Sequence, residues 1–120
     1  MIMNEQDKQL LLQDLCARLP YGVIVQDRNG VHVLTQGNTE FADLFNGKCN
    51  IKPYLRPISS MTEEEEIEYD ATFATIHING HYDSVMTYKS FDWINANHFD
   101  SRNLIEKGLA IAAPEGMYEV

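Results

Sequence analysis

Two histidines, His77 and His81, stand four residues apart, which on a helix would place both imidazoles on one face in the spacing of many zinc sites. The Asn-Gly pair between them argues against a helix, because this pair is typical of tight hairpin turns. In such a hairpin His77 pairs with Tyr82 and Ile78 pairs with His81, and neighbouring strand positions point to opposite faces. We therefore predict two surface histidines and no metal site.

A second group contains Asp92, His98 and Asp100, and a carboxylate that orients an imidazole is half of a general-base arrangement. A nucleophile is missing. The nearby Ser90 and Ser101 are both predicted helix caps, where backbone N–H groups engage the hydroxyl, and the chain has no Gly-x-Ser-x-Gly elbow. A structural His98 next to a helix end is the favoured interpretation over a catalytic one.

Glycine spacing speaks against nucleotide-dependent enzymes. The seven glycines are dispersed, and none follows a predicted strand in GxGxxG or GxxxxGK form. We expect neither enzymatic activity nor a cofactor.

The third group is Lys52, Tyr54 and Arg56, which alternate, so that in an extended chain all three side chains would project to one side. Ser59 and Ser60 follow, close to a predicted helix N-terminus. Arg56 offers a planar fork for phosphate and Tyr54 a ring for a base, which suits a nucleotide-like ligand better than a polymer. These five residues are the predicted ligand site. The alternative is that the two cations pair with the glutamates that follow.

Aromatic residues near the C-terminus give a candidate interface. Trp93 is the only tryptophan, and aromatic residues are enriched at binding hot spots. With His98 it forms our predicted interface pair, although aromatic residues at helical spacing, here with Phe91 and Phe99, are more often core.

Charge and length narrow the protein class. Nine Lys plus Arg against eighteen Asp plus Glu give −9, which opposes direct binding to DNA or RNA. Much of the excess lies in one run, Glu63 to Asp70, which predicts a solvated face, with mimicry of nucleic acid as a minor alternative. Two cysteines without CxxC spacing and the lack of any apolar run near the roughly 18 residues of a membrane span predict a cytoplasmic protein.

Periodicity predicts the elements of the first half. An amphipathic helix runs from Asn4 to Leu19 and ends at Pro20. Residues 21–26 and 31–36 predict a β-hairpin.

If Asn29 and Gly30 are the turn residues of this hairpin, Val25 faces Leu34 and Asp27 faces His32.

The middle of the chain gives weaker signals. Residues 39–45 have the spacing of a short helix or turn. In residues 51–58, Pro53 and Pro57 exclude a central strand and predict an extended connector over the surface or along a sheet edge. Thr62 followed by Glu65 predicts a capping box and a helix that ends near Asp70.

The second half predicts another hairpin and two further helices. Residues 71–78 and 81–88 flank the second Asn-Gly pair. Ser90 is expected to cap one helix, and Ser101 another that continues through Lys107 and ends at Gly108. The last dozen residues predict an ordered tail with a turn at 114–116. A single α+β domain over residues 1–120, with two β-hairpins and three or four short helices, accounts for this order.

Three blocks resemble a family of small phage and prophage proteins of Bacteroidetes: LLLQDLCARLPYGVIV, KPYLRPISSMTEEE and FDWINANHFDSRNLIEKGLAIAAPEGMY. The family has no known activity, so the resemblance transfers no catalytic or binding residue. It implies a protein made in the bacterial host cytoplasm during infection or lysogeny. Small proteins of this kind often act by binding, and many counter host immunity.

The leading hypothesis is a non-enzymatic phage accessory protein, homo-oligomeric, that sequesters a nucleotide-type immune signal at Lys52, Tyr54 and Arg56. The alternative is a protein–protein inhibitor or adaptor that binds a host protein through its acidic helix or the Trp93 region. The third is a small hydrolase centred on His98 and Asp100.

Overall fold

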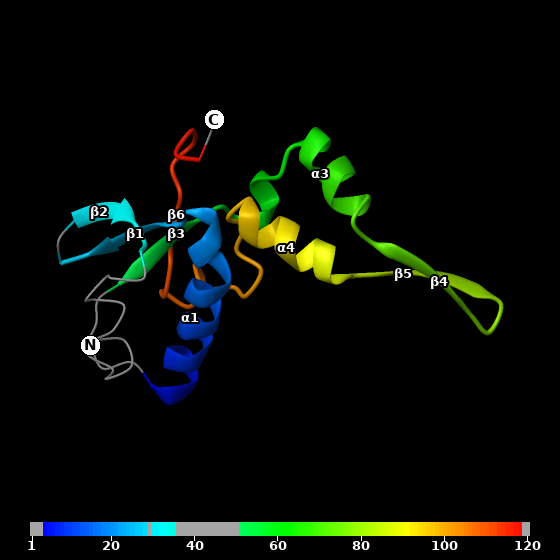
Figure 1. Ribbon diagram of the computed structural model, residues 1–120, viewed down its shortest axis with the longest axis horizontal. Coiled ribbons are helices and arrows are strands. Elements are labelled where there is room, and N and C mark those ends of the chain that lie inside the picture. Colours follow the sequence, from blue (N-terminus) through cyan, green and yellow to red (C-terminus); the bar gives the residue numbers. More distant parts are fainter. Residues whose placement is uncertain (1–3, 29, 36–50, 119–120) are drawn as a thin grey trace.

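The computed structural model describes residues 4–28, 30–35 and 51–118, which form three α-helices and two small sheets (Figure 1). This single small α+β domain with two hairpins confirms the predicted fold class. The sheets have the orders β2-β1-β3-β6 and β4-β5. The elements are α1 (Glu5–Arg18), η1 (Leu19–Tyr21), β1 (Ile24–Asp27), β2 (Gly30–Val33), β3 (Lys52–Leu55), η2 (Ile58–Ser60), α3 (Glu63–Asp70), β4 (Ala74–Ile78), β5 (His81–Val85), α4 (Tyr88–Ala96) and β6 (Ile111–Ala112).

The core lies between α1, the four-stranded sheet and the segment that follows α4. Leu11 and Leu15 lie on one face of α1 and are fully buried, as the helical spacing predicts. Each such side chain contributes roughly 1.5–3 kcal/mol through burial. They pack in one cluster with Val23, Val25, Leu34, Ile51, Leu55, Leu104, Leu109 and Ala110.

Strand β3 corrects the prediction that prolines exclude a central strand at 51–58, because it lies inside the sheet between β1 and β6. Pro53 is opposite Val25. Leu34 N–H donates to the Val23 carbonyl, so by alternation the polar backbone groups of Val25 also face β2. Pro53 therefore sits in a non-hydrogen-bonded pair with β1. Its missing N–H faces the β6 side, where pairing begins only at Tyr54.

The first hairpin forms with a register two residues from the predicted one. Val25 is opposite His32 and not Leu34, and Asp27 is opposite Gly30. His32 Nε2 still lies 3.1 Å from an Asp27 carboxylate oxygen. A slip of two residues keeps every side chain on its face, so the hydrophobic pattern could not distinguish the two registers.

Helix caps follow local sequence at some ends and depart from it at others. The Thr62–Glu65 capping box and the end of α3 at Asp70 are confirmed. The cap of α4 is Thr87 and not Ser90, whose hydroxyl accepts from the Thr87 N–H as the other half of a capping box. The predicted Ser90 cap is therefore wrong by three residues.

The predicted helix from Ser101 to Lys107 is also wrong, because this segment forms turns. The carboxylate of Asp100 accepts hydrogen bonds from the backbone N–H groups of Leu104, at 2.9 Å, and Ile105, at 3.0 Å. These bonds take the place of a serine cap. The possible helix or turn at residues 39–45 lies outside the described residues.

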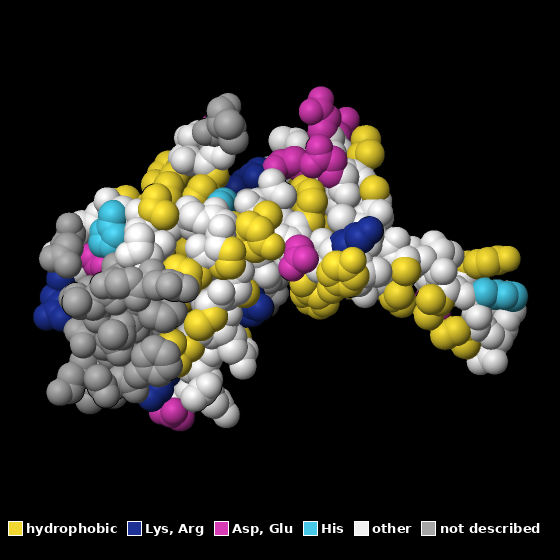
Figure 2. All heavy atoms as spheres, viewed as in Figure 1, with side chains coloured by type: hydrophobic (Ala, Val, Ile, Leu, Met, Phe, Trp, Pro, Cys, Tyr) yellow, Lys and Arg dark blue, Asp and Glu magenta, His cyan; other side chains and the backbone are white. Residues whose placement is uncertain are grey.

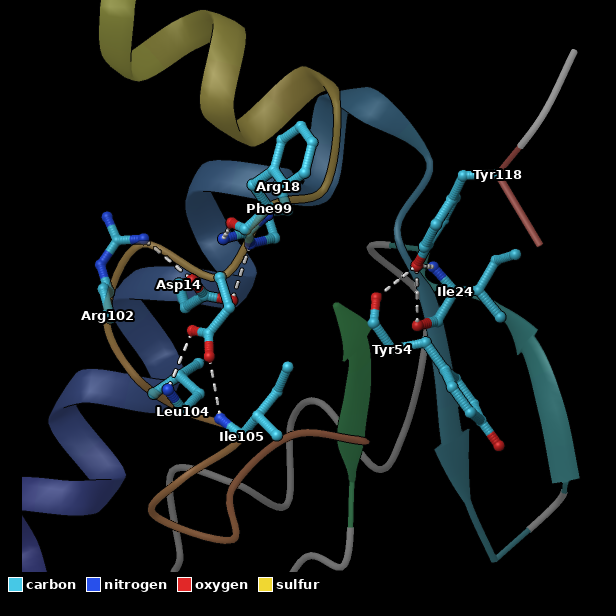
Figure 3. Close-up of polar contacts among 10 residues, drawn as sticks. Asp14, Arg18, Ile24, Tyr54, Phe99, Arg102, Leu104, Ile105 and Tyr118 are labelled. Carbon is cyan, nitrogen blue, oxygen red and sulfur yellow. Dashed lines mark hydrogen bonds and ion pairs between the residues drawn. The ribbon is translucent and has the colours of Figure 1, made fainter. Parts of the chain in front are cut away.

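A buried ion pair within α1 also contacts the segment after α4 (Figure 3). Asp14 and Arg18 have fully buried side chains, with 2.9 Å between Oδ2 and Nε. Arg102 Nη1 lies 2.8 Å from the other carboxylate oxygen of Asp14, and Arg18 Nη2 donates to the Phe99 carbonyl. Asp14 and Arg18 thus hold residues 99–102, which follow α4, against α1.

Replacing Asp14 by Ala is expected to destabilise the fold by about 3–5 kcal/mol, because it leaves the buried guanidinium of Arg18 without its carboxylate. Urea unfolding monitored by circular dichroism measures this. The control is Gln13→Ala, one position along on the exposed side of α1, which should change the free energy of unfolding by less than about 0.5 kcal/mol. Equal effects of the two changes would contradict the structural role of the ion pair.

Candidate functional site

The candidate site is a pocket of about 700 Å³ between the end of β3, the start of α3 and the C-terminal segment. Figure 2 shows the surface hollowed between the C-terminal segment and α3. We call it the Arg56 pocket. It is lined by Arg56, Pro57, Ser60, Thr62, Glu65, Asn97, Ala113, Pro114, Glu115, Gly116, Met117 and Tyr118.

Arg56 is held in the pocket wall through both its backbone and its side chain. Its N–H donates to the His98 carbonyl at 2.7 Å, and its carbonyl accepts from the Asp100 N–H at 2.9 Å. Its guanidinium donates to both carboxylate oxygens of Glu65, at 2.8 and 2.7 Å. This two-bond geometry is the stronger and more directional form of the ion pair.

Glu65 serves two purposes. Its Oε1 accepts from the Thr62 N–H at 3.0 Å and so completes the capping box of α3. The hydrogen bonds from Arg56 are the main reason that its pKa lies below the ordinary value, with burial opposing them. At neutral pH the N-terminus of α3 and the Arg56 fork are therefore both already occupied by one carboxylate. For Arg56, pairing with a following glutamate is thus the alternative to ligand binding that the sequence left open.

Arg56 packs on the first of a row of four aromatic rings. Its guanidinium carbon lies 4.1 Å from the ring centroid of Phe99. Phe99 stacks on Trp93 at 5.7 Å, and Trp93 stacks on Tyr69 at 5.3 Å. Tyr69 meets Phe73 edge to face at 5.0 Å. Trp93 thus contributes to internal packing while staying partly exposed, and its predicted role in an interface stays a prediction.

His98, the other predicted interface residue, is buried, with 6% of its surface exposed. Its ring stacks on Tyr118 at 3.9 Å between centroids, and its backbone has φ of 63°, a strained value for a histidine. Burial above all, and then the positive charges of Arg18 and Arg56, lower its pKa to about 4. Its Nδ1 is buried without a hydrogen-bond partner.

The acid and imidazole cluster does not assemble into a general-base arrangement. Both carboxylate oxygens of Asp100 accept from backbone N–H groups, Asp92 is exposed, and the described residues give His98 no carboxylate partner. Ser90 is buried in the α4 capping box. The geometry does not favour the hydrolase hypothesis for His98 and Asp100.

Tyr118 closes the pocket and enters the sheet (Figure 3). The β1–β3 register would place Ile24 opposite Tyr54, but the Tyr118 hydroxyl takes that position in the ladder. It accepts from the Ile24 N–H at 2.9 Å and donates to the Tyr54 carbonyl at 2.6 Å. Burial raises the pKa of this phenol to about 12. These hydrogen bonds hold Tyr118, the last described residue of the C-terminal segment, against β1 and β3.

The five predicted ligand residues are divided by the structure. Arg56 and Ser60 line the pocket, whereas Lys52, Tyr54 and Ser59 do not. Lys52, Tyr54 and Arg56 do alternate with buried neighbours along β3. The pocket, however, opens only at the end of that strand. The alternation of Lys52, Tyr54 and Arg56 predicts which side chains point away from the core. It does not predict where along the strand a pocket forms.

The other pocket residues were missed by sequence reasoning. Thr62 and Glu65 carried a signal, but only as helix caps. Asn97 and Tyr118 carried none, because they reach the pocket only through the turn after α4 and the path of the C-terminal segment. Within residues 4–28, 30–35 and 51–118, no three His, Cys, Asp or Glu residues gather as a metal site. His77 instead stacks on Tyr82 at 4.6 Å, in the predicted strand pair.

Comparison of this chain with protein-family models, with curated proteins and with solved structures finds no match. The resemblance to phage and prophage proteins therefore stays a prediction. In the described part of the chain no helix has the length and apolar character needed to cross a membrane.

The buried neutral imidazole of His98 predicts a pH dependence of stability. Its pKa is about 4 in the folded protein and near 6.5 when unfolded, so the unfolded state binds the proton first as pH falls. The contribution of His98 to the free energy of unfolding should be constant above pH 6.5 and fall between pH 6.5 and 4, by up to about 3 kcal/mol. Urea unfolding at a series of pH values measures the profile.

The variant His98→Asn is the informative comparison. Asparagine tolerates the left-handed backbone and does not titrate, so the loss of stability over this pH range should become shallower than in the parent chain. His77→Asn, at an exposed position, is the control and should keep the parent profile. A His98→Asn profile parallel to the parent profile would show that His98 does not set it.

Proposed function

We propose that this chain is a non-enzymatic binding protein that holds a small nucleotide-type ligand of low charge in the Arg56 pocket. The observation that supports this most directly is the pocket volume of about 700 Å³ together with its lining. Drug-sized ligands occupy pockets of this size, usually against an apolar wall with a few placed polar groups. Here Pro57, Pro114 and Met117 supply apolar surface beside amide, hydroxyl and charged groups.

The charges of the lining indicate the class of ligand. One cation, Arg56, stands with two carboxylates, Glu65 and Glu115. A triphosphate would have to displace Glu65 from Arg56 and approach Glu115. Carboxylates do suit the hydroxyl groups of a ribose or the amino group of a base as hydrogen-bond acceptors. The pocket therefore favours a nucleoside or a ligand with one phosphate, such as a cyclic nucleotide unit, over a highly charged one.

The resemblance to phage and prophage proteins gives this proposal its setting. A protein made in the host cytoplasm during infection, with a pocket and with no catalytic group assembled among its described residues, would act by sequestering a nucleotide-type defence signal. Sequestration needs affinity and abundance but no chemistry.

Isothermal titration against nucleosides, mononucleotides, cyclic dinucleotides, ADP-ribose and nucleoside triphosphates tests the proposal. We expect binding of at least one low-charge member and weaker binding of the triphosphates. A bound ligand should also raise the melting temperature by mass action. No heat and no thermal shift with any member would overturn the proposal.

Two neighbouring serines give a matched pair for that test. Ser60→Tyr fills the pocket and should weaken binding by roughly tenfold or more, since steric exclusion removes contacts in the bound state. Ser59→Tyr is the control: it is exposed in the same short helix but does not line the pocket, and should leave binding unchanged. Equal losses in both variants would place the ligand elsewhere.

A second function is favoured by the exposed face of α3. This helix has four glutamates in its first turn and buries none of its residues, and Ile67 on it is 70% exposed. An acidic helix with an exposed aliphatic side chain suits a basic groove on a host protein, as an inhibitor or adaptor would use. Purified chain as bait in host lysate should then capture a stoichiometric partner, and Ile67→Asp should release it. Capture that survives Ile67→Asp would contradict this use of α3.

A further inference from the structure

The hairpin of β4 and β5 projects from the molecule as an arm (Figure 1). The chain measures 52 × 32 × 25 Å with a radius of gyration of 16.0 Å, against about 14 Å for a compact domain of this length. All ten strand residues of the arm are exposed or only partly buried, and the Asn79–Gly80 turn has φ of 51° and 81°. An isolated two-stranded hairpin is only marginally stable in water, so pairing with a further strand would stabilise this one.

The register shows which backbone groups of the arm are unused. Ile78 is opposite His81 across the two-residue turn, so this pair exchanges both hydrogen bonds, as do Ile76 with Asp83 and Ala74 with Val85. The N–H and C=O groups of Thr75 and His77 then point away from β5. Within the residues that the structure describes, the two-stranded sheet gives them no neighbouring strand.

The β4 edge lacks the devices that normally prevent pairing with another chain. Edge strands are usually protected by charged side chains, prolines or bulges. Residues 73–78, FATIHI, contain no Lys, Arg, Asp or Glu, no proline and no glycine, which is the composition of a strongly pairing strand. β5 differs, because it carries Asp83 at its centre.

We propose that β4 pairs with β4 of a second copy of this chain, antiparallel and with the two-fold axis at Ile76, to give a four-stranded intermolecular sheet. In this register Thr75 is opposite His77 of the other copy, and both present free N–H and C=O groups to each other. Ile76 faces its own equivalent in a non-hydrogen-bonded pair, where side chains come closest. Ala74 faces Ile78. The edge is thus complementary to itself in both hydrogen bonding and side chains.

The net charge opposes association of two copies at most surfaces, and the arm is where this repulsion is weakest. Two chains of −9 repel each other at most surfaces, but the arm keeps their acidic parts apart, and screening acts beyond about 10 Å at 0.1 M salt. A basic partner would instead be drawn to α3, which carries the glutamates. The arm offers such a partner a single carboxylate, Asp83.

Exposed apolar side chains gather in the same half of the molecule. Figure 2 shows hydrophobic side chains along the arm and beneath α4. Of the ten large hydrophobic residues that are exposed in the described part of the chain, six lie between residues 67 and 91, which supports an interaction surface in this half. They are Ile67, Ile78, Tyr82, Met86, Tyr88 and Phe91.

Sedimentation equilibrium over a range of concentrations tests the proposal. Because a five-residue strand pair buries less than a standard interface, we expect a reversible dimer that strengthens as salt screens the repulsion. Thr75→Pro removes one outward N–H per copy and should weaken dimerisation roughly tenfold or more. Ser84→Pro is the matched control, since Ser84 is opposite Thr75 and points its backbone groups outward on the β5 edge.

A cross-linking experiment guards against a folding defect in the proline variants. In a chain with both native cysteines replaced by serine, Ile76→Cys should form a disulfide-linked dimer under mild oxidation, because equivalent side chains meet at the axis. Asp83→Cys, opposite Ile76 within the hairpin, should not.

A monomer at every concentration and salt would overturn the proposal. So would a dimer that Thr75→Pro leaves intact, or one that Ser84→Pro alone abolishes, since that would move the interface to β5. The inference does not depend on the proposed ligand, because titration of the Arg56 pocket and sedimentation of the arm variants are separate measurements.

Discussion

Phe99 is held between two arginines, and the arrangement of α1, β3 and the segment after α4 depends on this. Arg18 donates to its carbonyl from the core side. Arg56 lies over its ring and pairs with the backbone on either side of it. Each guanidinium is in turn held by a carboxylate, Asp14 for Arg18 and Glu65 for Arg56. The segment after α4 is thus tied to α1 and to β3 at one residue, and the pocket forms where these elements meet.

The two parts of the molecule on either side of Phe99 differ in how many of their side chains are buried. Around α1 and the four-stranded sheet, leucine and valine side chains are fully buried in one cluster. α3 buries none of its residues, and the arm is largely exposed. Regions with few buried contacts open at lower free energy than the core. The proposed ligand therefore meets a pocket whose wall is fixed by Arg56 and Tyr118, while the proposed dimer uses the less stable part, where pairing adds stability.

Local rules were sufficient where neighbouring residues decide the structure. Asn79 and Gly80 specify their turn, and the capping box at Thr62 specifies the start of α3, because both depend on residues within a few positions. Such rules failed where two local solutions compete or a distant partner decides. Thr87 and Ser90 are both residue types that can cap a helix, and Pro53 is accommodated because pairing with β6 begins beyond it. The pocket could not be predicted from sequence, since it needs the packing of three separate segments.

The two proposed surfaces are joined by one continuous row of rings, which leads from Phe73 at the base of the arm through Tyr69 and Trp93 to Phe99 under Arg56. Contiguity alone does not make this row a route of communication, because coupling needs an element with two arrangements that both sites bias. The structure gives the rings one arrangement, and two hydrogen bonds hold the Arg56 fork. With no second arrangement for either site to bias, the free energies of ligand binding and arm pairing are expected to add.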